Sequence, residues 1–313
     1  MGNTFSESAR QSFVVMKNEI KKFFSGKRML VFAIILAAII FIIAVTPYMV
    51  GNTAKPFMFV SVASLVVLMA STLFASISIV SEYEERTALI VFTRPIRKTS
   101  IFIGKMLACF VVTIGFTLLY YIVAIIVGLL VEHEFNPDMM VSFGMACAYA
   151  FATTGIAMLV SSVLKKASTA SIITFVILAV IFLALSIVLG ATDVDTSWLL
   201  STAADSIQNS SSDYRDYTNE MLDSIVTLLS NPSSFFTMGW EDTLTADGYD
   251  PDVFLAEVTK IWGLNATTMN LGQVSEPDYI HDVAVMVVWG LVGLVGAFVA
   301  FLRREAQDFN HYH

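Results

Sequence analysis

Long apolar runs separated by short polar segments dominate this chain. Each of six runs lacks Asp, Glu, Lys, Arg and His; they occupy residues 29–50, 56–81, 106–131, 139–164, 167–192 and 283–302. A helix rises about 1.5 Å per residue, so each run can cross a hydrocarbon core of about 30 Å with its backbone hydrogen bonds satisfied internally. The pattern therefore predicts six membrane-spanning helices. The first run is full length and has no small-residue cleavage site, which favours an uncleaved span over a signal peptide.

The segment before the first run has the pattern of an amphipathic helix. Apolar residues recur there three or four positions apart, and polar residues fill the other side; the apolar set is Phe13, Met16, Ile20 and Phe23, and the polar set is Lys17, Asn18, Lys21 and Lys22. Such a helix lies along a membrane surface, although a helix covered by another subunit shows the same pattern. We expect residues 1–28 to form an N-terminal amphipathic interfacial helix.

A polar stretch of about ninety residues, 191–281, separates the fifth and sixth runs and holds 15 acidic residues against two basic ones. Apolar residues recur at helical spacing in 217–229 and 253–262, with turn residues between them. The sequence thus predicts an all-α membrane protein with four parts. These are the amphipathic helix (1–28), five spans with a coupling loop at 82–105 (29–190), a small, mostly helical external domain (191–281), and the sixth span with a tail (282–313).

The composition supports a membrane protein, because 56% of the residues are hydrophobic and only 14% are charged. Its basic residues set the orientation. With six spans, both termini and the loops 82–105 and 165–166 share one side, and that side carries 15 of the 18 lysines and arginines. The positive-inside rule places this side in the cytoplasm. We expect a multi-pass protein of the cell membrane with both termini cytoplasmic and the acidic domain outside.

Motifs for catalysis or metal binding are missing from the sequence. Gly26-Lys27 has lysine rather than glycine at position 21, so no phosphate-binding loop exists, and His133-Glu134 lacks the second histidine of a zinc motif. The acidic cluster near Gly248 lacks the closing glutamate of a calcium loop.

Cys109 and Cys147 lie inside apolar runs, where we expect them to pack. Spans without ionisable residues also disfavour ion-coupled transport. We expect no catalytic residue, no metal, no cofactor in this chain and no nucleic-acid partner.

Small and hydroxyl residues in the spans suggest helix packing. In the last run, small residues spaced for a packing face are Gly290, Gly293, Gly296, Ala297 and Ala300. The hydroxyl residues of the fourth run are Thr153, Thr154, Ser161 and Ser162, which could either pack helices or line a polar path. Asn209 and Asn265 each begin a triplet that fits a glycosylation acceptor.

The loop after the second run combines an apolar strip with charged flanks. The strip is Leu89, Ile90 and Phe92, and the flanking residues are Glu82, Glu84, Glu85, Arg86, Thr87, Arg94, Pro95, Arg97 and Lys98. Basic residues alone would set topology, but topology does not require an apolar strip. An apolar strip on a cytoplasmic loop is typical of a docking surface.

This loop resembles that of permease subunits of ATP-binding-cassette (ABC) transporters of the type-2, mainly exporter, family. The residues that match in order are Ser81, Glu82, Glu84, Glu85, Thr87, Arg94, Pro95, Ile96, Gly104 and Lys105, while Arg86 stands where the family usually has glycine. Leu228-Leu229-Ser230-Asn231-Pro232-Ser233 is similar to a segment of copper-enzyme maturation permeases.

The resemblance implies a membrane permease driven by a separate cytoplasmic ATPase subunit. That subunit would bind ATP and Mg and dock on the loop, and a second permease, either another copy of this chain or a paralogue, would pair with this one around the transport path. Two alternatives use the same spans: a membrane scaffold or receptor that presents the acidic domain without transport, and an enzyme acting in the membrane, which the lack of catalytic motifs disfavours.

Overall fold

The structure is a computed structural model that describes residues 2–49, 54–84, 97–133, 135–190, 192, 194–230 and 274–310, among which no strand occurs. The helices are α1 (Gly2–Ser25), α2 (Lys27–Met49), α3 (Pro56–Phe74), α4 (Val80–Glu84), α6 (Lys98–Val131), α7 (Asp138–Val163), α8 (Ala167–Phe175), the π-helix η1 (Val176–Ile181), α9 (Phe182–Gly190), α10 (Leu200–Asn209), α11 (Ser212–Ser230) and α15 (Tyr279–Asn310). The predicted all-α class is confirmed.

Six helices in the described part are long and apolar enough to cross a membrane, as predicted. α8, η1 and α9 together make the fifth, Ala167–Leu189. Two boundaries differ from the prediction. The second span is interrupted, because α3 ends at Phe74 and turns lead from there into α4. The third helix begins at Lys98 rather than near Met106, so that Lys105 lies inside it.

The chain divides into two compact units. The first, the membrane unit, comprises Met1–Ser211 and Pro277–His313, and the second comprises Ser212–Glu276. The external domain was predicted to start at residue 191, but α10 lies in the membrane unit, where it packs on α3, α7 and α15. In the second unit, α11 spans the predicted helix 217–229, and Asn219 bonds both the backbone N–H and the carbonyl of Val274. The predicted helix 253–262 lies outside the described residues.

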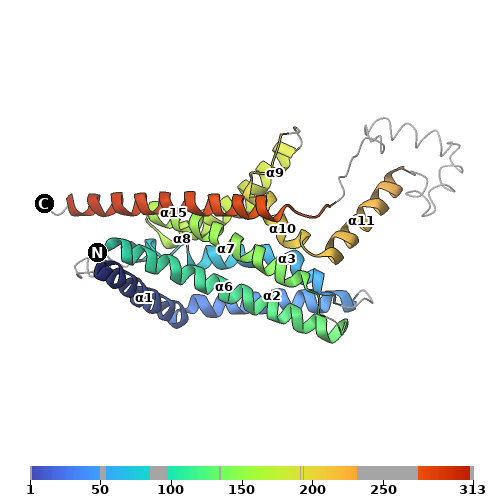
Figure 1. Cartoon of the computed structure of the whole chain (residues 1–313), viewed down its shortest axis with the longest axis horizontal. Coiled ribbons are helices and arrows are strands. Elements are labelled where there is room, and N and C mark those ends of the chain that lie inside the picture. The colour runs from blue at the N-terminus through green and yellow to red at the C-terminus, as the bar shows by residue number, and fades with distance from the viewer. Residues whose placement is uncertain are drawn as a thin grey trace, which may run out of the picture. The chain divides into compact units, whose positions relative to one another are not determined.

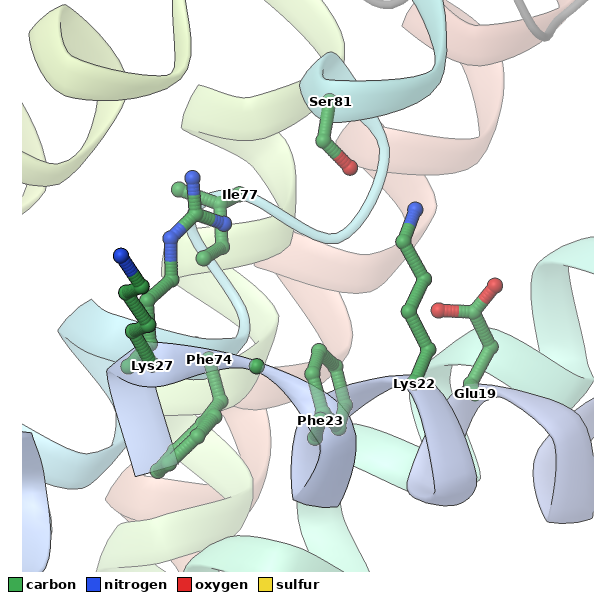
Figure 2. Close-up of a pocket in the computed structure, with 9 residues that line it drawn as sticks. Glu19, Lys22, Phe23, Lys27, Phe74, Ile77 and Ser81 are labelled. Atoms are coloured by element: carbon green, nitrogen blue, oxygen red, sulfur yellow. The ribbon is translucent and has the colours of Figure 1, made fainter. Parts of the chain in front are cut away.

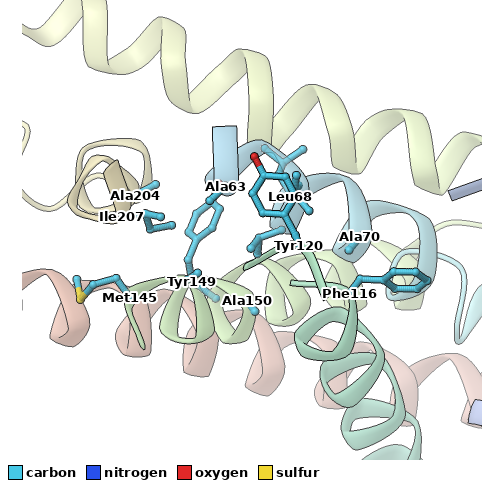
Figure 3. Packing of buried hydrophobic residues seen from close by; sticks show 14 of the residues in the cluster. Ala63, Leu68, Ala70, Phe116, Tyr120, Met145, Tyr149, Ala150, Ala204 and Ile207 are labelled. Atoms are coloured by element: carbon cyan, nitrogen blue, oxygen red, sulfur yellow. The ribbon is translucent and has the colours of Figure 1, made fainter. Parts of the chain in front are cut away.

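Helix α7 is central to the membrane unit and packs on α3, α6 and α15 (Figure 1). Its 26 residues place buried side chains against all three neighbours. Figure 3 shows Tyr149 of α7 among Ala63 of α3 and Ile207 of α10 in one apolar cluster. By contrast, only 11% of the most apolar stretch of α2 and 17% of that of Ala167–Leu189 are buried. These two spans present most of their apolar surface to lipid or to another chain.

The predicted small-residue face of the last span lies against α7. A methyl group on Gly293 would come within 2.5 Å of the carbonyl carbon of Gly155, and one on Gly290 within 2.4 Å of the Phe151 ring. Ala297 is fully buried at the same interface. The two helices approach backbone to backbone because glycine carries no side chain there.

Candidate functional site

A hydroxyl group from α7 stabilises the backbone where the second span is interrupted. Where α3 gives way to turns, the backbone N–H groups of Ile79 and Val80 both donate to Ser161 Oγ at 3.1 Å. A broken helix leaves backbone groups without their usual partners, and a buried group of that kind costs free energy unless it is bonded. Ser161 supplies the missing acceptor. Its position in the sequence suggested helix packing or a polar path, and gave no sign of this contact.

A buried lysine joins three elements just beyond this interruption. Lys105 on α6 is only 1% exposed, and its ammonium group lies 2.7 Å from Glu82 Oε1 of α4 and 2.8 Å from Glu19 Oε1 of α1. It also donates to the carbonyl of Ser78 at 2.9 Å. An ammonium group has three N–H donors, so this geometry uses all of them. The pairing ties α1, α4 and α6 together at one point.

Glycine beside this lysine lets α1 approach α6. A methyl group on Gly104 would lie 2.7 Å from both the carbonyl oxygen of Ser12 and Val15 Cβ. Near the start of α6, Arg97 Nη1 donates to Ser8 Oγ at 3.2 Å, and Ser100 Oγ donates to the carbonyl of Ser8 at 3.3 Å. The Gly-Lys pair of the loop motif therefore has two separate tasks: the glycine allows close packing of α1, and the lysine forms the ion pairs.

Helix α1 spans the predicted amphipathic segment, and part of its apolar face stays open. Phe13 is 61% exposed, whereas Phe23 packs edge-on against Phe74 of α3 with ring centroids 5.4 Å apart. Lys17 and Lys21 are exposed on the polar side. An open apolar face beside exposed lysines suits the predicted position at a membrane surface.

Tyr83 and Glu84 make contacts with two further helices. The guanidinium of Arg304 on α15 lies 3.9 Å from the centroid of the Tyr83 ring and donates to the carbonyl of Leu164 at 2.6 Å. Glu84 Oε2 accepts the N–H of Ala167, the first residue of α8, at 2.8 Å. A carboxylate at this position satisfies an unpaired N–H and interacts favourably with the positive end of the helix dipole.

Residues 82–84 therefore connect to four different helices within one turn. Glu82 contacts α1 and α6 through Lys105, Tyr83 contacts α15, and Glu84 contacts α8. These residues, with 97–105 and Arg304, define what we call the loop end of the membrane unit.

The predicted docking residues divide into two groups. Glu82 is buried and pairs with Lys105 through Oε1, whereas Glu84, Arg97 and Lys98 are exposed. The others lie outside the described residues: Glu85, Arg86, Thr87, Leu89, Ile90, Phe92, Arg94 and Pro95. The motif thus includes a buried part that holds helices together, which the sequence did not distinguish from the exposed part.

The opposite end of the membrane unit, which we call the α10 end, is held mainly by hydrogen bonds between uncharged groups, with the carboxylate of Asp282 as one charged acceptor. Tyr121 OH lies 2.6 Å from Ser142 Oγ, which donates to the carbonyl of Ile207 on α10 at 2.6 Å. Trp289 Nε1 donates to the carbonyl of Trp198 at 3.0 Å. Ser206 of α10 donates to the carboxylate of Asp282. These bonds fasten α10 across the ends of α6, α7 and α15.

One carboxyl at the α10 end has a raised pKa. Desolvation by the surrounding helices and the nearby carboxylate of Asp282 raise the pKa of Asp205 to about 6, although part of its side chain stays exposed. Asn209, a predicted glycosylation acceptor, ends α10 and is half-buried, and the serine of its triplet, Ser211, is buried. Asn265 lies outside the described residues.

Neither end gathers ligands for a metal. Among the described residues, no group of three or more His, Cys, Asp or Glu side chains is placed to hold an ion. Cys109 is buried and Cys147 half-buried, and both are free thiols.

Comparison with known proteins agrees with this arrangement. A family model described as "ABC-2 family transporter protein" matches residues 13–306, which include the second half of α1, the loop end and all six spans. A search of curated proteins gave no match to the chain.

Proposed function

The chain belongs to the ABC-2 family of transporters and is a membrane permease of an ABC transporter, and we propose that a separate cytoplasmic ATPase drives it through residues 82–98. Permeases of this family normally partner with an ATP-binding subunit. The observation that carries the proposal is the set of contacts at 82–84, which link the start of the docking segment to four helices.

In the proposed mechanism, the apolar strip binds the ATPase and residues 82–84 transmit its motion. Burial of apolar area contributes about 25 cal/mol per Å², whereas an exposed charge pair contributes only about 0–1 kcal/mol. Leu89, Ile90 and Phe92 therefore supply most of the affinity, and the exposed charges of Glu84, Arg97 and Lys98 orient the partner. The ion pair of Glu82 with Lys105 is buried, so salt and water screen it little. In this mechanism, the pair makes α6 follow a displacement of α4.

Further parts of the proposal concern orientation and assembly. The distribution of lysine and arginine supports a cell-membrane protein with cytoplasmic termini and an external second unit. The largely unburied apolar surfaces of α2 and Ala167–Leu189 suit a second permease copy that encloses a transport path with this one. The resemblance of the loop to exporters supports outward transport, and the narrower resemblance to copper-enzyme maturation permeases stays a prediction.

Co-purification tests the docking proposal. Leu89→Ser combined with Phe92→Ser removes apolar contact from the segment, so an affinity-tagged chain should lose its ATPase subunit while still inserting in the membrane. The matched control is Val163→Ser with Leu302→Ser, which changes two exposed apolar residues elsewhere in the membrane unit. Normal recovery of the ATPase with the docking variant would contradict the proposal.

Cysteine labelling tests the orientation. Lys166 and Thr192 are exposed and lie just before and just after the same span. In a chain with Cys109 and Cys147 replaced by alanine, an impermeant thiol reagent on intact cells should label Thr192→Cys but not Lys166→Cys. The reverse labelling would overturn the orientation.

A further inference from the structure

A cavity of about 270 Å³ lies at the corner where α1 ends and α2 begins (Figure 2). Three cationic side chains line it: Lys22 from α1, and Lys27 and Arg28 from the first turn of α2. A water molecule occupies about 30 Å³ of liquid volume, so the cavity has room for a group the size of a phosphate diester. Nothing in the proposed transport role requires this cavity.

The floor of the cavity is apolar. Phe23, Phe74 and Ile77 line it, and the two phenylalanine rings pack edge to face with centroids 5.4 Å apart. In Figure 2 these rings lie between Lys22 on one side and Lys27 on the other. The cavity therefore offers cationic groups beside aromatic surface, a combination that suits an anion attached to an apolar body.

The charge balance favours an anion. Glu19 also borders the cavity and shares the ammonium of Lys105 with Glu82, so these three groups together keep one negative charge, against the three cations of the lining. Among the residues that the structure describes, no carboxylate pairs with Lys27 or Arg28. Both belong to the first turn of α2, where the helix dipole adds positive potential. An anionic group entering the cavity meets a net positive field.

The cavity lies at the depth of lipid headgroups. The apolar run of α2 starts at Met29, directly after Lys27 and Arg28, so these two cations mark the boundary of the hydrocarbon region. Beyond that boundary α2 exposes long apolar side chains, including Leu30 at 63% and Ile34 at 61%. A lipid with its phosphate in the cavity could lay its acyl chains along such a surface.

We propose that this cavity binds the phosphate-bearing headgroup of an acidic phospholipid. Lys22, Lys27 and Arg28 contact the phosphate oxygens, and Phe23 and Phe74 contact the apolar start of the lipid. Basic recesses between spans at the cytoplasmic surface recognise acidic headgroups through the same combination of charge and depth. Binding requires only this chain, so it can be measured without an ATPase.

Native mass spectrometry of the purified full chain from nanodiscs tests the proposal. The discs contain either phosphatidylcholine alone, phosphatidylcholine mixed with phosphatidylglycerol, or phosphatidylcholine with inorganic phosphate added to the buffer. We expect phosphatidylglycerol to remain bound after release from the mixed discs, and phosphatidylcholine not to. Inorganic phosphate should bind weakly, because it lacks the apolar part that meets Phe23 and Phe74. Retention of both lipids alike, or strong binding of inorganic phosphate alone, would overturn the assignment to a lipid.

Substitution of the three cations that line the cavity tests whether the lipid binds there. Each lysine or arginine close to an acidic headgroup contributes a roughly fivefold change in affinity, so Lys22→Gln, Lys27→Gln and Arg28→Gln, which remove the cations of the cavity, should together reduce phosphatidylglycerol retention by at least about tenfold. The charge-retaining set of Lys22→Arg, Lys27→Arg and Arg28→Lys should preserve it, which separates loss of charge from loss of folding.

A second set of variants supplies the matched control. Lys17, Lys21 and Lys166 are exposed cations that do not line the cavity, and their change to glutamine removes the same charge. This control should retain phosphatidylglycerol. An equal loss in the control would show that general surface charge, and not the cavity, attracts the lipid, and would overturn the proposal. Neither result depends on ATPase docking, whose failure would appear in the co-purification experiment instead.

Discussion

The two ends of the membrane unit are held together by different kinds of interaction. At the loop end, Lys105 forms buried ion pairs with Glu19 and Glu82. At the α10 end, Tyr121 and Ser142 reach the carbonyl of Ile207 through hydroxyl groups. Neutral hydrogen bonds contribute about 0.5–1.5 kcal/mol each, whereas loss of one partner from a buried ion pair costs about 3–5 kcal/mol.

This difference indicates a division of roles between the ends. A buried ion pair specifies one arrangement, because any other arrangement leaves a charge unpaired in a poorly solvated place. That property suits the loop end, where motion of a docked subunit would have to move α1, α4 and α6 together. At the α10 end, no buried ion pair occurs among the described residues, and the bonds of Ser142 and Trp289 are neutral and individually modest, with Asp282 as one charged acceptor.

The largest effect is expected from removing the shared cation. Lys105→Met leaves the buried Glu82 and the partly buried Glu19 without their partner, so the chain should lose about 3–5 kcal/mol of unfolding free energy, measured by thermal unfolding in nanodiscs. Lys17→Met, at an exposed position on α1, is the control and should change little. Replacing all three charges, with Lys105→Met, Glu19→Leu and Glu82→Leu, should recover much of the loss. If the single variant Lys105→Met unfolds like the unaltered chain, the ion pairs of Lys105 do not hold α1, α4 and α6 together.

A smaller effect is expected midway between the ends, where α15 meets α7. Gly293→Ala places a methyl group against the backbone of Gly155, which cannot move aside easily, and should cost about 1–3 kcal/mol of stability. Gly115→Ala is the matched control, since a methyl group there meets no atom within 4 Å. It should be neutral or slightly stabilising because alanine favours helix. Equal melting temperatures for the two variants would contradict the close approach of α7 and α15.

The α10 end should respond less than the loop end to loss of a polar group. Ser142→Ala removes the bond to Ile207 and leaves the Tyr121 hydroxyl without that partner, at a cost of about 1–2 kcal/mol. Ser25→Ala removes an exposed hydroxyl on α1 and should cost nothing measurable. A loss for Ser142→Ala as large as that for Lys105→Met would remove the contrast between the ends.

The smallest effect should come from Glu84, which is exposed and contacts a single N–H. Glu84→Ala removes the acceptor at the start of α8 at a cost of about 0.3–1 kcal/mol, so global unfolding should barely change. Hydrogen exchange should accelerate at Ala167 and not at Ala170, whose N–H bonds within the chain to the carbonyl of Lys166. Unchanged exchange at Ala167 would show that Glu84 does not cap this helix in solution.

The spans could be predicted from the sequence because each is an uninterrupted apolar run whose length matches the bilayer. The interruption after Phe74 could not, since its stability depends on Ser161, which lies far along the chain and is compatible with an ordinary helix. A run of hydroxyl and apolar residues such as 56–81 is compatible with either an uninterrupted or an interrupted helix. The local sequence pattern therefore does not show which of the two forms.

The sequence predicted where the candidate site lies along the chain, but it did not predict which residues contact one another there. Glu82 and Lys105 were part of the loop motif, yet their pairing with each other and with Glu19 depends on how α1 folds back onto α6. The one available signal was Glu19 itself, a lone acidic residue among Lys17, Lys21 and Lys22. The cavity lined by Lys22, Lys27 and Arg28 also needed the structure, because Phe74 and Ile77 come from another span.

Photo-crosslinking from the docking segment tests the central claim most directly. A photoreactive amino acid at Ile90, in cells that produce the complete transporter, should yield a crosslinked product between this chain and an ATP-binding subunit. The same amino acid at Val163, an exposed position on α7, should not. A crosslink to the ATP-binding subunit at Ile90 alone is the result that the account predicts. No crosslink at Ile90, or one of equal yield at Val163, would contradict docking on residues 82–98.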